Sequence, residues 1–149
     1  MTDKTAPCLW FNGDGKGKEA AELYVSLIPN SRIVSDQHPM VVFELDGRRY
    51  MILDAGPMYT LSPAVSIYVD CDDQAEIDRL WAALLADGGE EIRCGWLTDR
   101  FGVSWQIIPK VLPVLFADPD RAAANRAMEA MMAMQKIDIA ALQRAFDGA

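Results

Sequence analysis

The chain has 149 residues, of which 51% are hydrophobic and 24% are charged, so it has the size and composition of one globular domain. Its formal net charge of −8 argues against nucleic acid or an anionic membrane surface as a partner, because both are bound through basic faces. No apolar run approaches the roughly 20 residues of a membrane span, and the first 11 residues lack a long apolar signal segment. We therefore expect a single cytoplasmic domain over residues 1–149, whose three cysteines are free thiols.

The first part of the chain predicts a strand, a helix and then further strands. Residues 7–12 are short, apolar and preceded by a turn, which is typical of a strand, and apolar side chains recur at helical spacing within residues 19–27. Residues 31–37 and 40–45 alternate with the period of two that strands show. Asp46 and Gly47 then predict a hairpin turn into a strand over residues 48–53.

The second part repeats this order. Residues 63–68 predict a strand, 75–84 a helix and 90–96 a strand, and the turn at 99–102 leads into a last strand at 103–108. Residues 7–12 align over 63–68, and the strands that follow Gly47 and Gly102 align so that Met51 matches Gln106. From residue 111 the chain turns helical: Asp118 and Pro119 predict the start of one helix, and Asp138 predicts the cap of the last.

Five segments along the chain carry a more specific signal: PCLWFNG, EAAELYVSLIPNS, AGPMYTLSPAVSIYVDC, CGWLTDRFGVSWQIIP and MEAMMAMQKIDIAAL. In this order they resemble the PhnB-like family of the vicinal oxygen chelate superfamily, which includes glyoxalases, bleomycin resistance proteins and dioxygenases. The resemblance implies an α+β fold in which two βαβββ modules, residues 7–57 and 63–109, form a curved mixed sheet, followed by a helical tail at 111–149. It also implies a homodimer, since the superfamily commonly pairs subunits.

Strand alternation locates a candidate ligand site. Val103, Trp105 and Ile107 share the face that suits a helix layer, which leaves Gln106 on the opposite face with Ser104 and Ile108. The same reasoning turns side chains of the opening strands toward a cavity between the modules. The predicted ligand-binding set is Trp10, Asn12, Ser66, Tyr68, Trp96, Ser104 and Gln106. Core packing is the alternative for each tryptophan, and a bond to a neighbouring strand or to water is the alternative for Gln106.

Metal-dependent members of the superfamily place His or Glu ligands at inward positions of the opening and closing strands. Carried onto this sequence, those positions are Cys8, Met51, Ala64 and Gln106. Hard divalent cations prefer carboxylate or imidazole ligands, so we expect no metal and no cofactor. Gln106 then replaces a metal-binding Glu and orients an unknown small molecule instead. His38 precedes a proline in a loop and is interpreted as solvated. Asp99 and Arg100 start the last hairpin and are interpreted as capping a turn or pairing with each other or a neighbour; a position at the cavity mouth is the alternative.

The PhnB-like family often carries the name 3-demethylubiquinone-9 3-methyltransferase, and residues 12–17 form a glycine-rich stretch that could be mistaken for a methyl-donor loop. The alternating βαβα pattern of a Rossmann-type methyltransferase is missing, so we interpret this stretch as a flexible connection. We expect metal-independent binding of a small molecule, with no reaction assigned. A metal-dependent enzyme of the glyoxalase or dioxygenase type and a sequestering, resistance-type binder remain the alternatives.

Overall fold

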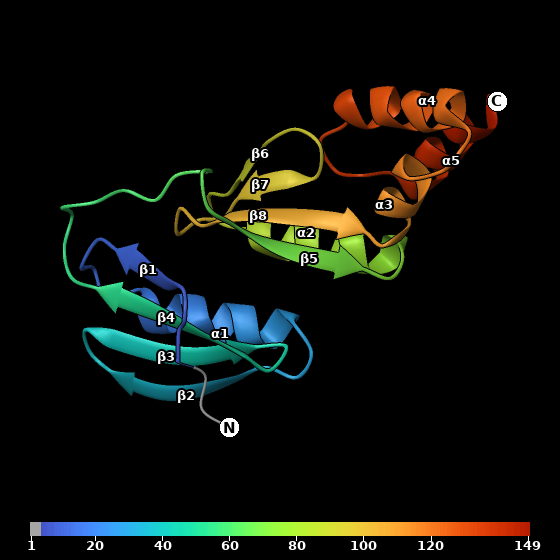
Figure 1. Cartoon of the computed structure of the whole chain (residues 1–149). Coiled ribbons are helices and arrows are strands. Elements are labelled where there is room, and N and C mark those ends of the chain that lie inside the picture. Colours follow the sequence, from blue (N-terminus) through green and yellow to red (C-terminus); the bar gives the residue numbers. More distant parts are fainter. Residues whose placement is uncertain (1–3) are drawn as a thin grey trace. The chain divides into compact units, whose positions relative to one another are not determined.

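The order of elements in the chain occurs twice (Figure 1). The computed structural model describes residues 4–149 and divides them after Leu61 into unit 1 and, from Ser62 to Ala149, unit 2. Each unit contains one four-stranded mixed sheet and the helix that follows its first strand. The predicted α+β class with two βαβββ modules and a helical tail is therefore confirmed. The assignment of all residues to a single domain stays a prediction.

Unit 1 comprises β1 (Cys8–Phe11), α1 (Gly17–Leu27), β2 (Arg32–Gln37), β3 (Met40–Leu45) and β4 (Arg48–Asp54). The strand order is β1-β4-β3-β2; β1 runs parallel to β4, and the other neighbours are antiparallel. The predicted turn between β3 and β4 is confirmed, because Asp46 and Gly47 both have positive φ. The apolar faces of α1 and the sheet meet in a core that contains Leu9, Phe11, Ala20, Tyr24, Phe43 and Ile52.

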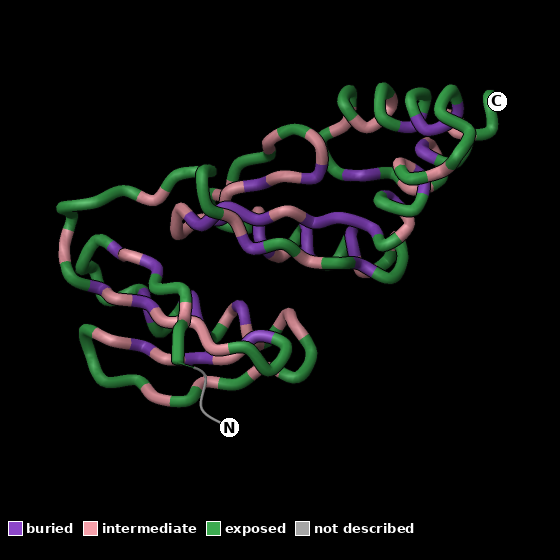
Figure 2. The backbone as a smooth tube through the Cα atoms, in the orientation of Figure 1, coloured by how far each residue is buried: buried purple, intermediate pink, exposed green. Residues whose placement is uncertain are grey.

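Unit 2 has the same topology, with β5 (Ser66–Cys71), α2 (Gln74–Leu85), β6 (Glu90–Glu91), β7 (Trp96–Thr98) and β8 (Ser104–Pro109). The strand order is β5-β8-β7-β6, and β5 is parallel to β8. Helix α2 packs on one face of this sheet. Figure 2 shows buried positions along most of β8. The predicted helix-facing set Val103, Trp105 and Ile107 is fully or almost fully buried, as expected.

Two predicted strands differ from the structure. The segment 90–96 is not one strand but the β6–β7 hairpin, because Cys94 and Gly95 have positive φ and Trp96 N donates back to Arg93 O. The second opening strand starts at Ser66 instead of residue 63, and Val65, within the predicted strand, is 67% exposed. Pairing across the sheet determines this register, and an apolar run alone cannot show it.

The register also corrects the alignment of the repeat. Cys8 pairs with Met51 in unit 1, and Tyr68 pairs with Gln106 in unit 2. Because Met51 and Gln106 are equivalent positions of the two closing strands, the equivalent of Cys8 is Tyr68, not Ala64. The opening strands were therefore aligned four residues out of step, while the closing strands were aligned correctly.

The tail forms α3 (Val111–Phe116), α4 (Arg121–Met132) and α5 (Ile139–Asp147). Asp138 caps α5 as predicted, since its side chain accepts a hydrogen bond from Ala141 N. The predicted cap of the preceding helix was wrong: Asp120 caps α4 by accepting from Ala123 N. Asp118 instead accepts from Asp120 N, one turn before the helix.

None of the helices within residues 4–149 has the length and the apolar character needed to cross a membrane.

Cys71 is a buried thiol at the end of β5, and it predicts a pH effect on stability. Burial, with smaller contributions from Glu76 and Asp70, raises its pKa from the ordinary 9.0 to about 12. Above pH 9 the unfolded chain loses this proton while the folded chain keeps it, so stability falls as the pH rises toward 12. We expect the urea midpoint to fall more steeply with pH in the wild type than in Cys71→Ala. If the urea midpoint changed equally with pH in both proteins, the raised pKa would not belong to Cys71.

Candidate ligand pocket

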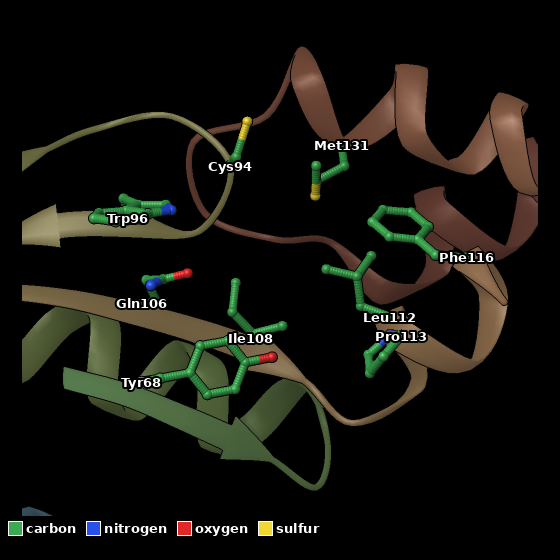
Figure 3. A pocket seen from close by; sticks show the side chains of 9 residues that line it. All are labelled: Tyr68, Cys94, Trp96, Gln106, Ile108, Leu112, Pro113, Phe116 and Met131. Carbon is green, nitrogen blue, oxygen red and sulfur yellow. The ribbon is translucent and has the colours of Figure 1, made fainter. Parts of the chain in front are cut away.

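A pocket of about 270 Å³ lies within unit 2, on the side of the sheet that carries α3 and α4 (Figure 3). The sheet contributes side chains from β5, β7 and β8, and the β6–β7 turn contributes one more. Helices α3 and α4 complete the lining. The lining residues are Tyr68, Cys94, Trp96, Gln106, Ile108, Leu112, Pro113, Phe116 and Met131. None of these nine side chains is Asp, Glu, Lys, Arg or His, so the pocket is built from neutral groups.

Gln106 lies on β8, an inner strand of the sheet, and its side chain is oriented by Ser66. Its Nε2 donates to Ser66 Oγ over 2.8 Å, which leaves the side-chain oxygen Oε1 to face the pocket lining. Oε1 has no hydrogen-bond partner among residues 4–149. A fixed amide with a free acceptor can bind a hydroxyl or N–H group of a ligand. The interstrand bond that we considered as the alternative for Gln106 therefore exists, but it engages only one end of the amide.

Two further polar groups in the pocket are uncommitted. The Trp96 indole N–H and the Tyr68 hydroxyl have no hydrogen-bond partner within the described part of the chain. Burial, together with the charge of Asp70, raises the pKa of the Tyr68 phenol above its ordinary value. Tyr68 therefore stays protonated and uncharged at neutral pH. The pocket offers one acceptor, one donor and one group that is both, and none of them carries a charge.

Ser66 and Ser104 are predicted site residues that do not line the pocket. They face each other in the β5–β8 register, and Ser66 holds the Gln106 amide. The Ser104 side chain is 1% exposed, and its hydroxyl has no partner among residues 4–149. The structure thus brings Ser66, Tyr68, Trp96, Ser104 and Gln106 of the predicted set into one region of unit 2.

Trp10 and Asn12 belong to unit 1, where each is engaged locally. The Trp10 indole N–H donates to Gly56 O over 2.7 Å, and its ring packs edge-on against Tyr59 at a centroid distance of 4.9 Å. Asn12 is exposed, and its amide lies 3.0 Å from a carboxylate oxygen of Asp14. Within unit 1 these contacts hold loops, so the role in ligand binding that we predicted for Trp10 and Asn12 stays a prediction.

Comparison with known proteins identifies the family of this chain. The family model described as 3-demethylubiquinone-9 3-methyltransferase matches residues 3–108. The chain belongs to this family. A PhnB protein from Bacillus cereus, described by the same enzyme name, is 32% identical, with a TM-score of 0.64 over 72% of this chain and 99% of its own.

More distant structures share the fold of this family member. A Pseudomonas aeruginosa protein is 22% identical, with a TM-score of 0.57 over 72% of this chain and 98% of its own. A fosfomycin resistance protein from Listeria monocytogenes is 14% identical, with a TM-score of 0.53 over 76% of this chain and 97% of its own. A search of the curated proteins found no match. The PhnB-like assignment and the glyoxalase-type fold are therefore confirmed.

The glycine-rich stretch near the start of this PhnB-like chain is held in place and is not a free anion-binding loop. Asp54 is 3% exposed, and its carboxylate accepts from Gly13 N at 2.6 Å and from Gly17 N at 3.1 Å. A phosphate or carboxylate ligand would compete with this carboxylate for the same backbone donors. Any Cβ at Gly13 would lie 2.7 Å from Gly56 N, so the close approach of two backbones requires glycine there. The predicted flexible connection is thus an anchored turn.

The metal positions implied by the superfamily are occupied by neutral donors. With the corrected register they are Cys8 and Met51 in unit 1 and Tyr68 and Gln106 in unit 2. Burial raises the pKa of the Cys8 thiol as well as that of the Tyr68 phenol. At neutral pH the four positions therefore hold a thiol, a thioether, a phenol and an amide. This set does not fit a hard divalent cation, which prefers carboxylate or imidazole ligands.

Several lining residues were not predicted. Ile108 shares the Gln106 face by alternation and could have been included on that signal. The turn residue Cys94 was assigned to a strand, so its direction was not predicted. Four tail residues, Leu112, Pro113, Phe116 and Met131, line the pocket because of how α3 and α4 dock, and periodicity predicts a helix without predicting its docking site. Asp99 caps the last hairpin as predicted, accepting from Phe101 N and Val103 N.

Proposed function

We propose that this PhnB-family chain binds a small, uncharged molecule in the unit 2 pocket, without a metal ion. The observation that carries the proposal is the Gln106 amide: Ser66 fixes one end of it, and the other end presents a free acceptor inside a neutral pocket. A preformed pocket with a few oriented polar groups is the usual form of a small-molecule site.

The donor chemistry supports metal independence over the glyoxalase or dioxygenase alternative. Neither unit supplies an anionic or imidazole ligand at the positions that the superfamily uses for metal. Methyl transfer from a Rossmann-type donor site is also unsupported, since each sheet is mixed and Asp54 occupies the amides of the glycine-rich turn.

The likeness to a fosfomycin resistance protein, at 14% identity, shows a shared fold and no shared ligand. Fosfomycin is a phosphonate anion, and anions in proteins are bound by Arg, Lys, a metal or a helix N-terminus. The unit 2 pocket has no cationic side chain among its lining residues. We therefore favour a neutral ligand, whether the chain sequesters it or acts on it. We also propose a cytoplasmic homodimer, for which the frequent pairing of subunits in the superfamily is the support.

Native mass spectrometry of protein purified without chelator or affinity metal tests the proposal. We expect no stoichiometric divalent metal and a retained small-molecule adduct. Gln106→Leu is expected to reduce the adduct by about 10-fold or more, because a buried ligand group would lose its acceptor. Gln37→Leu, at an exposed strand end, is the matched control and should keep the adduct. A stoichiometric divalent metal whose removal releases the adduct would contradict the proposal.

A further inference from the structure

Nearly half of the pocket lining follows the last residue that the family model matches. The family match ends at residue 108, and the Bacillus cereus structure is matched over 99% of its length by 72% of this chain. Helices α3 and α4 follow that point and contribute the C-terminal wall, defined as Leu112, Pro113, Phe116 and Met131. The sheet side of the pocket therefore lies within the range that the family model matches, and the wall lies in the tail that follows it.

Backbone hydrogen bonds hold the tail in a defined position on unit 2. Cys94 N donates to Met134 O at 2.9 Å and Gly95 N donates to Gln135 O at 2.8 Å, which joins the β6–β7 turn to the segment after α4. These bonds place the end of α4 over the turn that contains Cys94, beside Met131 of the wall.

The start of α5 is fixed just as closely. The Gln74 side chain at the start of α2 donates to Ile137 O at 3.0 Å and accepts from Ile139 N at 2.9 Å. Ile137 is fully buried, and Lys136 pairs with Asp78 at 2.9 Å. Because one end of the α4–α5 connection is bonded to the β6–β7 turn and the other to helix α2, the wall is part of the folded unit.

The two sides of the pocket have different chemistry. The sheet side carries the uncommitted polar groups of Tyr68, Trp96 and Gln106, whereas the C-terminal wall is apolar throughout. Such a division suits a molecule with a flat apolar body and one polar edge. An apolar cavity of about 150 Å³ accommodates a single benzene ring, so a pocket of about 270 Å³ has room for two fused rings.

We infer that the C-terminal wall sets the ligand class of this chain: an uncharged molecule with a two-ring aromatic body and one hydroxyl or N–H group that donates to Gln106. The inference rests on the proposed function of the same pocket. Phe116 and Met131 provide the face opposite the sheet, and the lack of any cation among the lining residues selects against an aromatic carboxylate of the same size.

Isothermal titration of the full chain with three probes tests this assignment. 2-Naphthol has the expected size and hydroxyl, naphthalene lacks the donor, and 2-naphthoate carries a negative charge. We expect 2-naphthol to bind at least 10-fold more tightly than either of the other two. Phe116→Leu, which keeps an apolar residue in α3, and Met131→Ala should each weaken 2-naphthol binding by 5-fold or more. Val114→Ala and Met132→Ala are the controls, because these side chains are 66% and 60% exposed on the same helices.

The possible outcomes distinguish ligand selection by the C-terminal wall from ligand binding by the pocket as a whole. If Gln106→Leu abolishes 2-naphthol binding but the Phe116 and Met131 variants bind as the wild type does, the wall has no selective role and the proposed function stands. If 2-naphthoate binds as tightly as 2-naphthol in a Gln106-dependent manner, the ligand class is wrong and the pocket is right. If no probe binds to a folded wild type, as judged by its cooperative thermal unfolding, the inference is overturned, and the proposed function is decided by the adduct in native mass spectrometry.

Discussion

Replacement of Asp99 by alanine is expected to lower the free energy of unfolding by about 3 kcal/mol or more. The Asp99 side chain is 3% exposed, and its carboxylate accepts three hydrogen bonds. Oδ1 accepts from Phe101 N at 2.9 Å and Val103 N at 3.0 Å, and Oδ2 accepts from the Trp105 indole at 2.9 Å. Alanine would leave the donors of Val103 and Trp105 buried without this acceptor, and each such loss is costly.

The effect should be specific to the buried carboxylate. Asp70→Ala removes an exposed carboxylate from strand β5 and should change the free energy of unfolding by less than about 0.5 kcal/mol. Urea denaturation monitored by tryptophan fluorescence measures both variants, since Trp105 lies against Asp99. A comparable loss in the two variants, or no loss in Asp99→Ala, would show that the β7–β8 turn does not depend on this carboxylate.

Gly95→Ala should destabilise the protein by about 2–4 kcal/mol, through backbone strain and steric overlap together. Gly95 has a φ of +83°, and a Cβ there would lie 2.7 Å from Ile108 Cδ1 and 3.0 Å from both Ile107 O and Ile137 Cγ1. Ile108 lines the pocket and Ile137 anchors the tail, so the added methyl group would disturb both. We expect a lower thermal midpoint and weaker ligand binding in the same variant.

Gly102→Ala is the matched control for this prediction. Gly102 has a φ of +88°, close to that of Gly95, but a Cβ there would meet no heavy atom within 4 Å beyond its chain neighbours. It should therefore show only the cost of placing alanine in a left-handed conformation, about 1–2 kcal/mol, and should leave ligand binding unchanged. If Gly95→Ala and Gly102→Ala lowered the free energy of unfolding equally, the packing of the tail against the β6–β7 turn would not contribute to stability.

The two units share one topology but carry different side chains at equivalent strand positions. At equivalent strand positions unit 1 holds Cys8 and Met51, and unit 2 holds Tyr68 and Gln106. Unit 1 uses Trp10 to hold the chain at Gly56, and unit 2 uses Gln106 with Ser66 to present an amide oxygen. The polar chemistry of the described pocket therefore comes from the second copy, which is also the copy that continues into the tail.

Local sequence determined much of this protein. The Asp46–Gly47 turn, the caps at Asp99 and Asp138, and the alternation that separates Gln106 from Trp105 all depend on near neighbours in the chain. Helices α1 and α2 begin and end within two residues of their predicted bounds, because apolar side chains at helical spacing mark the buried face directly.

Tertiary structure alone decided the rest. The register of β5 depends on pairing with β8 nearly 40 residues away in the sequence, and the break between β6 and β7 depends on Cys94 and Gly95 bonding to the tail. The C-terminal wall of the pocket likewise depends on where α3 and α4 dock, which Gln74 and Ile137 help to determine. These features arise from hydrogen bonds and packing between distant segments, and a pattern within one segment carries no information about which distant partner it will meet.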